Sequence, residues 1–386
     1  MSEATFVKRL PFNVYFSTVV MIGLIGLADS IYLSISHYRV YTDMTYQSFC
    51  AISRAINCDT VSQSPYSILF NLPLSVWGIL GYLFVLALMA VAWNHRNTKK
   101  NIWPTLFFIS LAFSIHSLAL GLISSLIINS YCIMCIVSYA VNFAMLFYCW
   151  LIYRRFESDS MINGFWTDLK GYARQPRRTI VFLSAFALLI LAAYAMIPSY
   201  WHMDVKLSTA GMATGRTADG HPWIGAEQPE LTITEFSDYQ CFQCKKMHFY
   251  LRQLIADNPG RIRLIHRHFP MDHNVNPIVN APFHIGSGKL AKIALFALEK
   301  EKFWEVNDHL FHLNEEKKTF NLRKMAADVD LDVVMLAASV NHPYIKARLS
   351  QDIREGMKWG MTGTPGFVIE GKLYSGQVPA HILERF

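Results

Sequence analysis

Five long apolar runs occupy the first half of the chain. A helix that crosses a bilayer needs roughly 20 mainly apolar residues. The runs that meet this length extend approximately over residues 14–36, 72–93, 102–128, 131–153 and 180–198. The pattern therefore predicts five membrane-spanning helices, of which the fifth is separated from the fourth by a more polar stretch.

After Glu230 the pattern changes to that of a soluble α/β domain. LTITEF alternates like a strand, CFQCKKMHFYLRQLIADN has helical periodicity, and RIRLIHRHF is a second strand. A mostly helical segment follows at approximately 280–339, and GTPGFVIEGKLYSG predicts two strands joined by a turn at Glu370 and Gly371. This order predicts a thioredoxin-like fold with a helical insertion. The glycine-rich residues 202–229 are expected to be a linker and the entry to this domain.

The composition agrees with a membrane protein, because 53% of the 386 residues are hydrophobic and only 16% are charged. A net charge of +7 could indicate a nucleic-acid partner, but the basic residues lie beside the apolar runs. They are Lys8, Arg9, His95, Arg96, Lys99, Lys100, Arg154, Arg155, Lys170, Arg174, Arg177 and Arg178. The positive-inside rule makes these segments cytoplasmic, so the charge indicates topology in a lipid bilayer and no nucleic-acid partner.

Five spans with a cytoplasmic N-terminus place three segments outside the cytoplasm: residues 36–71, the turn at 129–130, and everything after Pro198. We expect a membrane domain at 1–157, a cytoplasmic linker with the fifth span at 158–205, and an extracytoplasmic domain at 206–386. Disulfides form and persist in such a compartment.

A Cys-x-x-Cys pair, Cys241 and Cys244, follows the first soluble strand and opens a helix. The partial positive charge of a helix N-terminus stabilises a thiolate. Cys241 is therefore the expected nucleophile and Cys244 the resolving partner. A static disulfide or half of a zinc site would show the same spacing. The intervening Phe-Gln leaves the redox potential of the pair open.

Two further pairs belong to the membrane part. Cys132 and Cys135 lie at the outer end of the fourth span, where apolar surroundings suit delivery of electrons to a lipid-soluble acceptor such as a quinone. Zinc would need two more ligands there. Cys50 and Cys58 lie on the first outer loop, where a pair can reach a soluble partner and act as a shuttle. The alternative for the loop pair is a disulfide that only staples the loop.

Several other residues are candidates for a function because of their chemical type. Asp29 and His116 lie within predicted spans, where ionisable groups are costly; proton transfer and a purely structural hydrogen bond both remain open. Cys149 is expected to be a small buried hydrophobe. Three histidines, His248, His266 and His268, could be metal ligands or proton carriers. Surface or packing roles are expected instead, because no acidic or Cys partner stands at an obvious ligand spacing.

The segments EFSDYQCFQCKKMH and GMTGTPGFVIEG resemble the DsbA-type branch of the thioredoxin superfamily. The resemblance implies that Thr364-Pro365 faces the Cys pair with a cis peptide bond. It also implies that Glu235 is a buried acid that exchanges a proton with the inner cysteine.

Residues 10–155 resemble the vitamin K epoxide reductase family. The matching features are the loop Cys pair, Ser64 after it, Trp77-Gly78 in the second span, and the Cys-x-x-Cys followed by Tyr139. The resemblance implies a four-helix bundle around a quinone of ubiquinone or menaquinone type. Cys135 would face the quinone, Cys132 would accept electrons from the loop pair, and Ser64 and Tyr139 would lie beside the ring. The asparagine of vitamin K-reducing members has no clear match, so we expect plain quinone reduction.

Together these features predict an enzyme of the bacterial inner membrane, with a periplasmic thioredoxin-like domain, that forms disulfides in substrate proteins with reduced cysteines. Electrons would pass from Cys241/Cys244 to Cys50/Cys58, then to Cys132/Cys135, and then to the quinone pool. Each thiol step is an exchange that needs no metal. Two alternatives remain: a reductase or isomerase that uses the same cysteines, and a non-catalytic membrane protein with structural disulfides.

Overall fold

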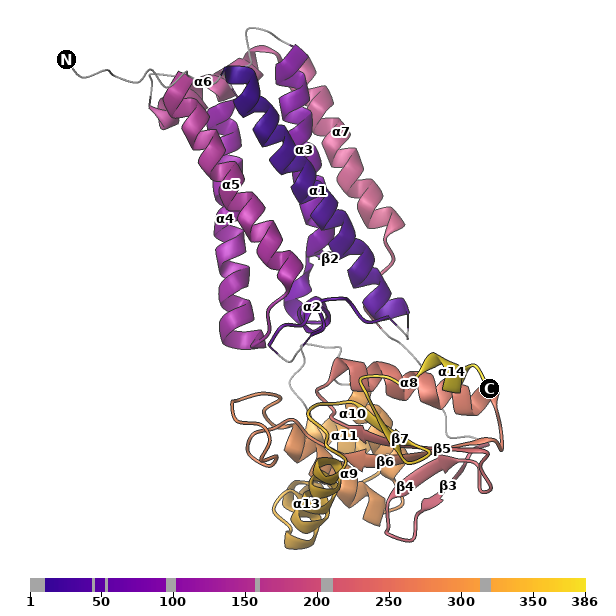
Figure 1. Cartoon of the computed structure of the whole chain (residues 1–386). Helices are drawn as coiled ribbons and strands as arrows, with labels where there is room; N and C mark the ends of the chain where they lie inside the picture. The colour runs from indigo at the N-terminus through magenta and orange to yellow at the C-terminus, as the bar shows by residue number, and fades with distance from the viewer. Residues whose placement is uncertain are drawn as a thin grey trace, which may run out of the picture. The chain divides into compact units, whose positions relative to one another are not determined.

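The computed structural model describes residues 11–43, 46–52, 55–94, 102–156, 160–202, 211–312 and 321–386. The chain divides into two compact units (Figure 1). The first comprises Met1–Thr42 and Gln47–Trp201, and the second comprises Asp43–Tyr46 and His202–Phe386. The predicted cytoplasmic basic residues at 8–9 and 95–100 lie outside the described residues.

The first unit contains five helices that are long and apolar enough to cross a membrane, as the sequence predicts. They are α1 (Phe12–Thr42), α3 (Leu74–Asn94), α4 (Trp103–Ile123), α5 (Ile133–Phe156) and α7 (Pro176–Met196), and a π-helical turn (Ser124–Ile128) extends α4. Helix α1 packs against α3 and α5, and α5 packs against α4, which makes a four-helix core. Helix α7 packs against α3 outside that core.

Close packing of the core depends on small residues at helix crossings. A side chain at Gly26 of α1 would collide with the ring of Tyr82 of α3, so glycine lets the two helices approach. Tyr82 is then free to donate a hydrogen bond to Asn142 Oδ1 of α5 at 2.7 Å. The apolar centre includes Phe16, Val19, Val85, Leu106 and Met145, each at most 5% exposed.

The loop between α1 and α3 contains secondary structure of its own. It contains the short helix α2 (Cys58–Ser62), the 3₁₀ turn Pro65–Ser67, and a tight hairpin of β1 (Ile68–Leu69) and β2 (Leu72–Pro73). Asn57 caps α2, because its Oδ1 accepts hydrogen bonds from the backbone N–H groups of Asp59 and Thr60.

The stretch predicted as a cytoplasmic linker contains a helix, α6 (Met161–Arg174), ahead of α7. Ser160 caps its N-terminus through the N–H of Asn163. Asp168 is buried and accepts a 2.7 Å hydrogen bond from Thr105 Oγ1 of α4. This helix therefore packs against the bundle.

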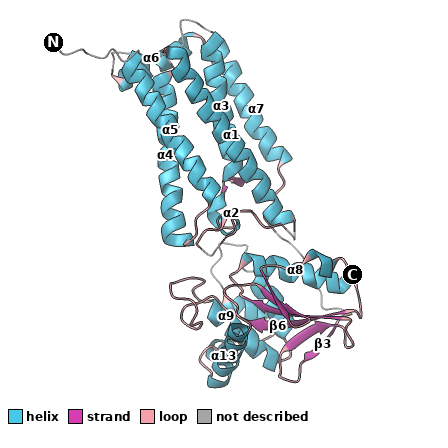
Figure 2. Ribbon diagram, in the orientation of Figure 1, coloured by secondary structure: helices cyan, strands magenta, loops and turns pink. Residues whose placement is uncertain are grey.

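The second unit is a six-stranded mixed sheet with helices around it (Figure 2). The strand order is β3-β4-β6-β5-β7-β8, and only the β5–β6 pair is parallel. The strands are β3 (Ala213–Arg216), β4 (Pro222–Gly225), β5 (Leu231–Ser237), β6 (Ile262–His268), β7 (Gly366–Ile369) and β8 (Lys372–Ser375). The sheet core includes Ile233, Leu264 and Phe367, all fully buried.

The segment 202–229, expected to be a linker and the entry to the thioredoxin-like domain, contains the hairpin of β3 and β4. Glycine in this segment serves close packing: a Cβ at Gly215 would lie 2.6 Å from the indole of Trp223 on the neighbouring strand. A glycine-rich stretch therefore extends the sheet by two strands.

Helix α8 (Phe242–Asp257) connects β5 to β6. The predicted helical insertion is present between β6 and β7 and is longer than expected. It comprises α9 (Ser287–Glu299), α10 (Phe303–His312), α11 (Leu322–Asp328), α12 (Val333–Ser339) and α13 (Pro343–Lys358), and α14 (Ala380–Leu383) follows β8. The predicted turn at Glu370 and Gly371 is present, with positive φ at both residues. The thioredoxin-like fold with a helical insertion is confirmed.

Candidate functional site

Three cysteine sulfurs of the first unit form one buried cluster. Cys50 and Cys58 are joined in a disulfide, with Cα atoms 5.7 Å apart. The Sγ atoms of Cys50, Cys58 and Cys132 all lie within 4.8 Å of one another, and each residue is at most 2% exposed. A thiolate at Cys132 is therefore placed beside a disulfide that it can attack.

Backbone pairing holds the loop against the start of α5. The N–H of Asn57 donates to the carbonyl of Tyr131 at 2.9 Å, and the N–H of Tyr131 donates to the carbonyl of Ala55 at 2.8 Å. These two bonds form a parallel bridge between Ile56 and Tyr131. Cys132 directly follows Tyr131, and Cys58 lies two residues after Ile56. The bridge therefore brings the two sulfurs together.

Cys132 and Cys135 are one turn apart at the N-terminus of α5. The backbone N–H of Cys135 donates to the Sγ of Cys132 at 3.3 Å, so a helix-end donor faces that sulfur. Cys135 is less buried than Cys132 and lines a cavity of about 430 Å³. The two sulfurs thus face different surroundings: the loop disulfide for Cys132 and the cavity for Cys135.

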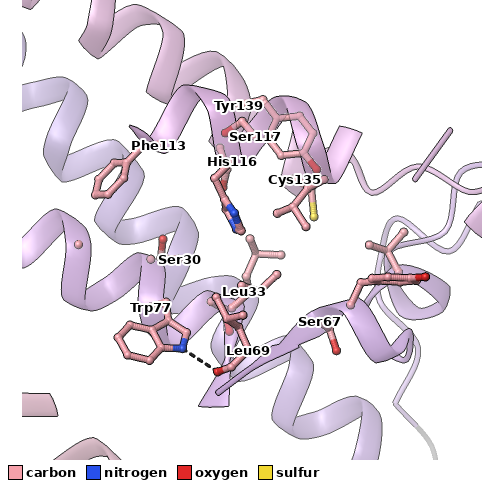
Figure 3. A pocket seen from close by; sticks show the side chains of 18 of the residues that line it. Ser30, Leu33, Ser67, Leu69, Trp77, Phe113, His116, Ser117, Cys135 and Tyr139 are labelled. Carbon is pink, nitrogen blue, oxygen red and sulfur yellow. Dashed lines mark hydrogen bonds between the residues drawn. The ribbon is translucent and has the colours of Figure 1, made fainter. Parts of the chain in front are cut away.

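The cavity lies inside the helical bundle and has mainly apolar walls. Its lining includes Ser30 and Leu33 of α1, Trp77 and Gly78 of α3, His116 and Ser117 of α4, Cys135, Ser138 and Tyr139 of α5, and Phe186 of α7. Figure 3 shows Cys135, His116 and Leu33 around the same space, with Trp77 donating to the carbonyl of Leu69 at 2.9 Å. An apolar cavity with few polar groups is typical of small-molecule sites.

Both predicted ring neighbours line this cavity, but in different ways. Tyr139 reaches it from α5, whereas Ser64 reaches it from the outer loop. The hydroxyl of Ser64 donates to the carbonyl of Val61 at 2.8 Å, so its proton is already engaged.

Three further polar residues occur at or near the cavity: His37, which the sequence does not single out, and Asp29 and His116, which it does. His37 lines it, and its ring nitrogens bond the hydroxyls of Tyr200 (2.8 Å) and Ser67 (3.3 Å). Asp29 itself is absent from the lining, but it accepts a hydrogen bond from Ser138, which does line the cavity. His116 lines the cavity directly.

In the second unit, Cys241 caps the N-terminus of α8. Its Sγ accepts the N–H of Cys244 at 3.2 Å and lies 3.5 Å from the carbonyl oxygen of Thr364. The Thr364-Pro365 bond is cis, as the resemblance implies. The strand order explains this contact, because β7 pairs with β5 and brings its first residues beside the end of β5.

The two sulfurs of this pair differ electrostatically. Burial raises the pKa of Cys241, but the hydrogen bond with Cys244, the charge of His284 and the N–H of Cys244 together bring the pKa below its usual value. Burial and the neighbouring Cys241 sulfur raise the pKa of Cys244 well above its usual value. This asymmetry favours Cys241 as the thiolate.

Glu235 lies in the middle of β5 and is 1% exposed. Its Oε1 accepts hydrogen bonds from His266 Nδ1 at 2.6 Å and from His248 Nδ1 at 3.1 Å. Burial by itself raises the pKa of this carboxyl, but the charges and hydrogen bonds of the two histidines lower it to about 2. The two N···O distances match ordinary hydrogen bonds.

His248, His266 and His268 are buried, which agrees with the expected packing role and excludes a surface role. The expectation that they have no acidic partner is wrong, because His248 and His266 share Glu235. The acid is distant in sequence and comes from a neighbouring strand, so no local spacing indicates it. His248 also bonds Asp308 at 3.1 Å, while His268 bonds Asp352 at 3.3 Å. All three rings are buried.

A second buried acid, Asp238, lies three residues before Cys241 and was not predicted. Its carboxylate accepts hydrogen bonds from the N–H of Gln240 (2.7 Å), the N–H of Met271 (2.6 Å), Ser287 Oγ (3.0 Å) and His284 Nδ1 (3.0 Å). The sequence signal was weak, because His284 belongs to the insertion and is far from the Cys pair along the chain.

Comparison with protein families assigns both parts of the chain. Residues 17–150 match the model of the vitamin K epoxide reductase family, and residues 217–386 match a thioredoxin family model.

Individual relatives are distant. The Na(+)/H(+) antiporter NhaA 3 of Salinispora tropica is 26% identical over 152 residues, which cover 39% of this chain and 22% of that protein. The Na(+)/H(+) antiporter NhaA of Herminiimonas arsenicoxydans is 26% identical over 156 residues, which cover 40% of this chain and 23% of that protein. The chain thus spans 22% and 23% of the length of these two curated relatives.

Among solved structures, a thioredoxin-like oxidoreductase from Silicibacter pomeroyi DSS-3 is 26% identical and covers 43% of this chain and 88% of its own, with a TM-score of 0.35. The thiol-disulfide exchange protein alpha-DsbA2 from Wolbachia pipientis is 24% identical and covers 43% of this chain and 84% of its own, with a TM-score of 0.34. The family matches carry the assignment: the chain joins in one polypeptide a vitamin K epoxide reductase family domain at residues 17–150 and a thioredoxin domain at residues 217–386.

Proposed function

We propose that this protein is a quinone-dependent thiol-disulfide oxidoreductase of a bacterial inner membrane that forms disulfides in extracytoplasmic proteins. The observation that carries the proposal is the sulfur cluster of Cys50, Cys58 and Cys132, within 4.8 Å of one another, next to Cys135 at an apolar cavity. A structural disulfide would not require a second Cys pair beside it.

The first step takes place at Cys241. A substrate thiolate attacks Cys241 Sγ of the oxidised pair, the Cys241–Cys244 bond breaks, and Cys244 leaves and takes up a proton. A second substrate thiolate then attacks the substrate sulfur of the mixed disulfide and releases Cys241. The substrate loses two electrons and gains a disulfide, and the Cys241/Cys244 pair is reduced.

The loop pair then accepts these two electrons. Cys241 attacks the Cys50–Cys58 disulfide, and Cys244 resolves the mixed disulfide, which leaves the loop pair reduced. Because both units belong to one chain, the encounter between these Cys pairs is intramolecular. It occurs at a high effective concentration and needs no diffusion of two separate proteins. The reduced loop pair reduces a Cys132–Cys135 disulfide in the same manner, through the sulfur of Cys132, which faces the loop.

The membrane quinone is the final acceptor and takes up two electrons and two protons. The residues fit such a molecule, because the cavity of about 430 Å³ is mainly apolar and Cys135 lines it. Cys135 would deliver the electrons as its bond to Cys132 re-forms, while Tyr139 and Ser64 hold the head group. Asp29, through Ser138, and His116 are the groups placed to supply protons.

The N-terminus would be cytoplasmic and the thioredoxin domain periplasmic. Arg154 and Arg155 in the last turn of α5, together with Arg174 at the end of α6, support this orientation.

Quinone reduction by the full chain tests the proposal. The purified protein in detergent is given a reduced dithiol protein and a soluble quinone analogue, and quinol is followed by absorbance. We expect one quinol for each substrate disulfide, and no quinol from Cys135→Ala, although that variant still exchanges disulfides at Cys241. Cys149→Ala, at a buried site against Ser110, is the matched control. Quinol formation by Cys135→Ala would refute the last step.

Trapping tests the transfer between the Cys pairs. With Cys244→Ser, Cys241 should remain in a mixed disulfide with a loop cysteine or a substrate, which peptide mapping detects. A loop pair that stays oxidised and never links to Cys241 would refute the transfer. A measured potential of the Cys241/Cys244 pair below that of the quinone couple favours oxidation of substrates through the chain; rapid isomerisation without quinone favours the isomerase alternative.

A further inference from the structure

The Cys pair of the thioredoxin domain has no cationic residue between its cysteines, where Phe242 and Gln243 stand. It also lies close to a buried carboxylate, Asp238, which is 1% exposed. A buried negative charge beside a thiolate is unfavourable unless a cation offsets it. The structure supplies one imidazole there, from the loop before α9.

Several contacts hold this imidazole in place. His284 Nδ1 lies 3.0 Å from Asp238 Oδ2, and the ring stacks on Phe283 with centroids 4.0 Å apart. Gln240, next to Cys241, donates through Nε2 to the carbonyl of Ile285 at 3.0 Å, which ties the loop to the cysteine. Cys241 in turn donates its N–H to the carbonyl of Asp238 at 3.0 Å.

The backbone at His284 is also unusual. Its φ of 38° lies in the left-handed region, which only a few per cent of non-glycine residues adopt. The next two residues also form hydrogen bonds. The N–H of Gly286 donates to Asp272 Oδ2 at 2.9 Å, and Ser287 Oγ donates to Asp238. A loop built with this many contacts fixes the ring position, with 20% of the His284 side chain open to solvent.

We propose that His284, held as an imidazolium by the positioning residue Asp238, is the cation that stabilises the Cys241 thiolate in this chain. It thus replaces a charge that the Phe-Gln dipeptide cannot supply. The role deepens the proposed function, on which it rests. When the second substrate thiolate releases Cys241 from the mixed disulfide, the departing sulfur carries the electron pair of the broken S–S bond. The imidazolium stabilises that charge without transferring its proton.

The titratable groups that act on Cys241 are Cys244 on α8, Asp238 on the loop before it, and His284 on the loop before α9. The charge of His284 lowers the pKa of Cys241, whereas the charge of Asp238 raises it. Removing the imidazole should therefore raise the pKa of Cys241, because nothing would offset the charge of the Asp238 carboxylate.

The first test measures the alkylation of Cys241 against pH in the full chain, by peptide mapping. His284→Asn keeps a residue that tolerates the left-handed backbone but removes the cation. We expect its midpoint pH to rise by about one unit, which is about a tenfold change in the acid dissociation constant. His284→Lys, which keeps a cation, should stay near the unaltered midpoint. His273→Asn, on the same loop, is the matched control. An unchanged midpoint in His284→Asn would overturn the proposal.

A second measurement needs no substitution. In the unaltered chain with labelled histidine, the NMR titration of His284 should move to higher pH when the Cys241/Cys244 pair is reduced, because coupling between two sites is reciprocal. Equal midpoints in the oxidised and reduced chain would overturn the proposal even if a variant fails to fold. Neither measurement uses quinone or the loop cysteines, so a failure of the proposed function would be seen separately, in the quinol assay.

Discussion

The backbone N–H of Asn57 donates to the carbonyl of Tyr131 at 2.9 Å and thereby places the loop disulfide next to the start of α5. The same asparagine caps α2 with its side chain, through the N–H groups of Asp59 (2.9 Å) and Thr60 (3.1 Å). One residue thus holds both the loop and the helix that begins with Cys58.

Asn57→Ala should loosen α2 and leave the backbone bridge to Tyr131 in place. Loss of an N-cap side chain costs about 1 kcal/mol, so amide hydrogen exchange in residues 58–62 should accelerate about fivefold. Mass-spectrometric exchange of the full chain measures this. Gln63→Ala is the control, because Gln63 caps the other end of α2 through its backbone. Unchanged exchange in Asn57→Ala would show that α2 depends on other contacts.

Cys135→Ser should trap electron transfer inside the membrane domain. Without its partner, Cys132 can attack the neighbouring disulfide but cannot be resolved, so a bond between Cys132 and one loop cysteine should accumulate. Non-reducing peptide mapping detects the linked peptides. Cys149→Ser, at the buried site near Ser110, should show no such product. An intact Cys50–Cys58 disulfide throughout would contradict direct exchange with Cys132.

Glu235→Gln should change the acid stability of the thioredoxin domain. Glu235 has a pKa lowered to about 2 from an ordinary 4.5, so its stabilising effect is complete above about pH 4.5 and is lost as the pH falls toward 2. This effect is about 3 kcal/mol at neutral pH, since each pKa unit is about 1.4 kcal/mol. The variant should be less stable than the unaltered chain at pH 7, and the difference should vanish near pH 2.

Urea unfolding of the full chain, followed by pulse proteolysis of the thioredoxin domain, measures that difference at several pH values. Glu230→Gln is the control, because that carboxylate is paired with Arg261 at the exposed start of β5. A stability difference that is constant with pH would show that the loss comes from packing and not from ionisation.

Gly78→Ala should disturb the cavity. A Cβ at this position would lie 2.5 Å from Ser30 Oγ on α1, and both residues line the cavity. Overpacking costs about 1 to 3 kcal/mol, so the unfolding temperature in detergent should fall and the apparent KM for the quinone should rise. Gly171→Ala on α6 meets no atom within 4 Å and should be neutral or slightly stabilising. Equal effects of the two substitutions would exclude the contact with Ser30 as the cause.

The sequence predicts the membrane helices and the Cys-x-x-Cys helix well, because their signals are local. Apolar runs of sufficient length mark the spans, and the change of periodicity after Glu230 marks the soluble fold. The turn at Glu370 and Gly371 is likewise a local signal that the structure confirms.

The β3–β4 hairpin was not predicted because its segment is rich in glycine, and α6 was not predicted because its residues were assigned to the linker before the fifth span. Gly164 of α6 lies against the Tyr153 hydroxyl and Pro104, and Gly215 lies against Trp223. In both cases the glycine allows a close approach to a side chain of a neighbouring element. A one-dimensional pattern cannot distinguish that use from a flexible linker.

The site residues that belong to a sequence motif were predictable. The residues that only folding brings together were not. The Cys spacings indicate three pairs, and the family resemblance implies that Cys132 meets the loop pair; the structure adds the bridge at Tyr131 that brings these sulfurs together. The partners of Glu235 and Asp238, His248 and His284 among them, come from other elements at positions without any spacing rule.

The bridge between the loop and α5 also bears on how this domain can change over evolutionary time. It is made from main-chain groups of Ala55, Asn57 and Tyr131, so the side chains of these three residues do not form it. A chain with other side chains at these three positions can therefore form the same bridge and keep the loop cysteines beside the start of α5.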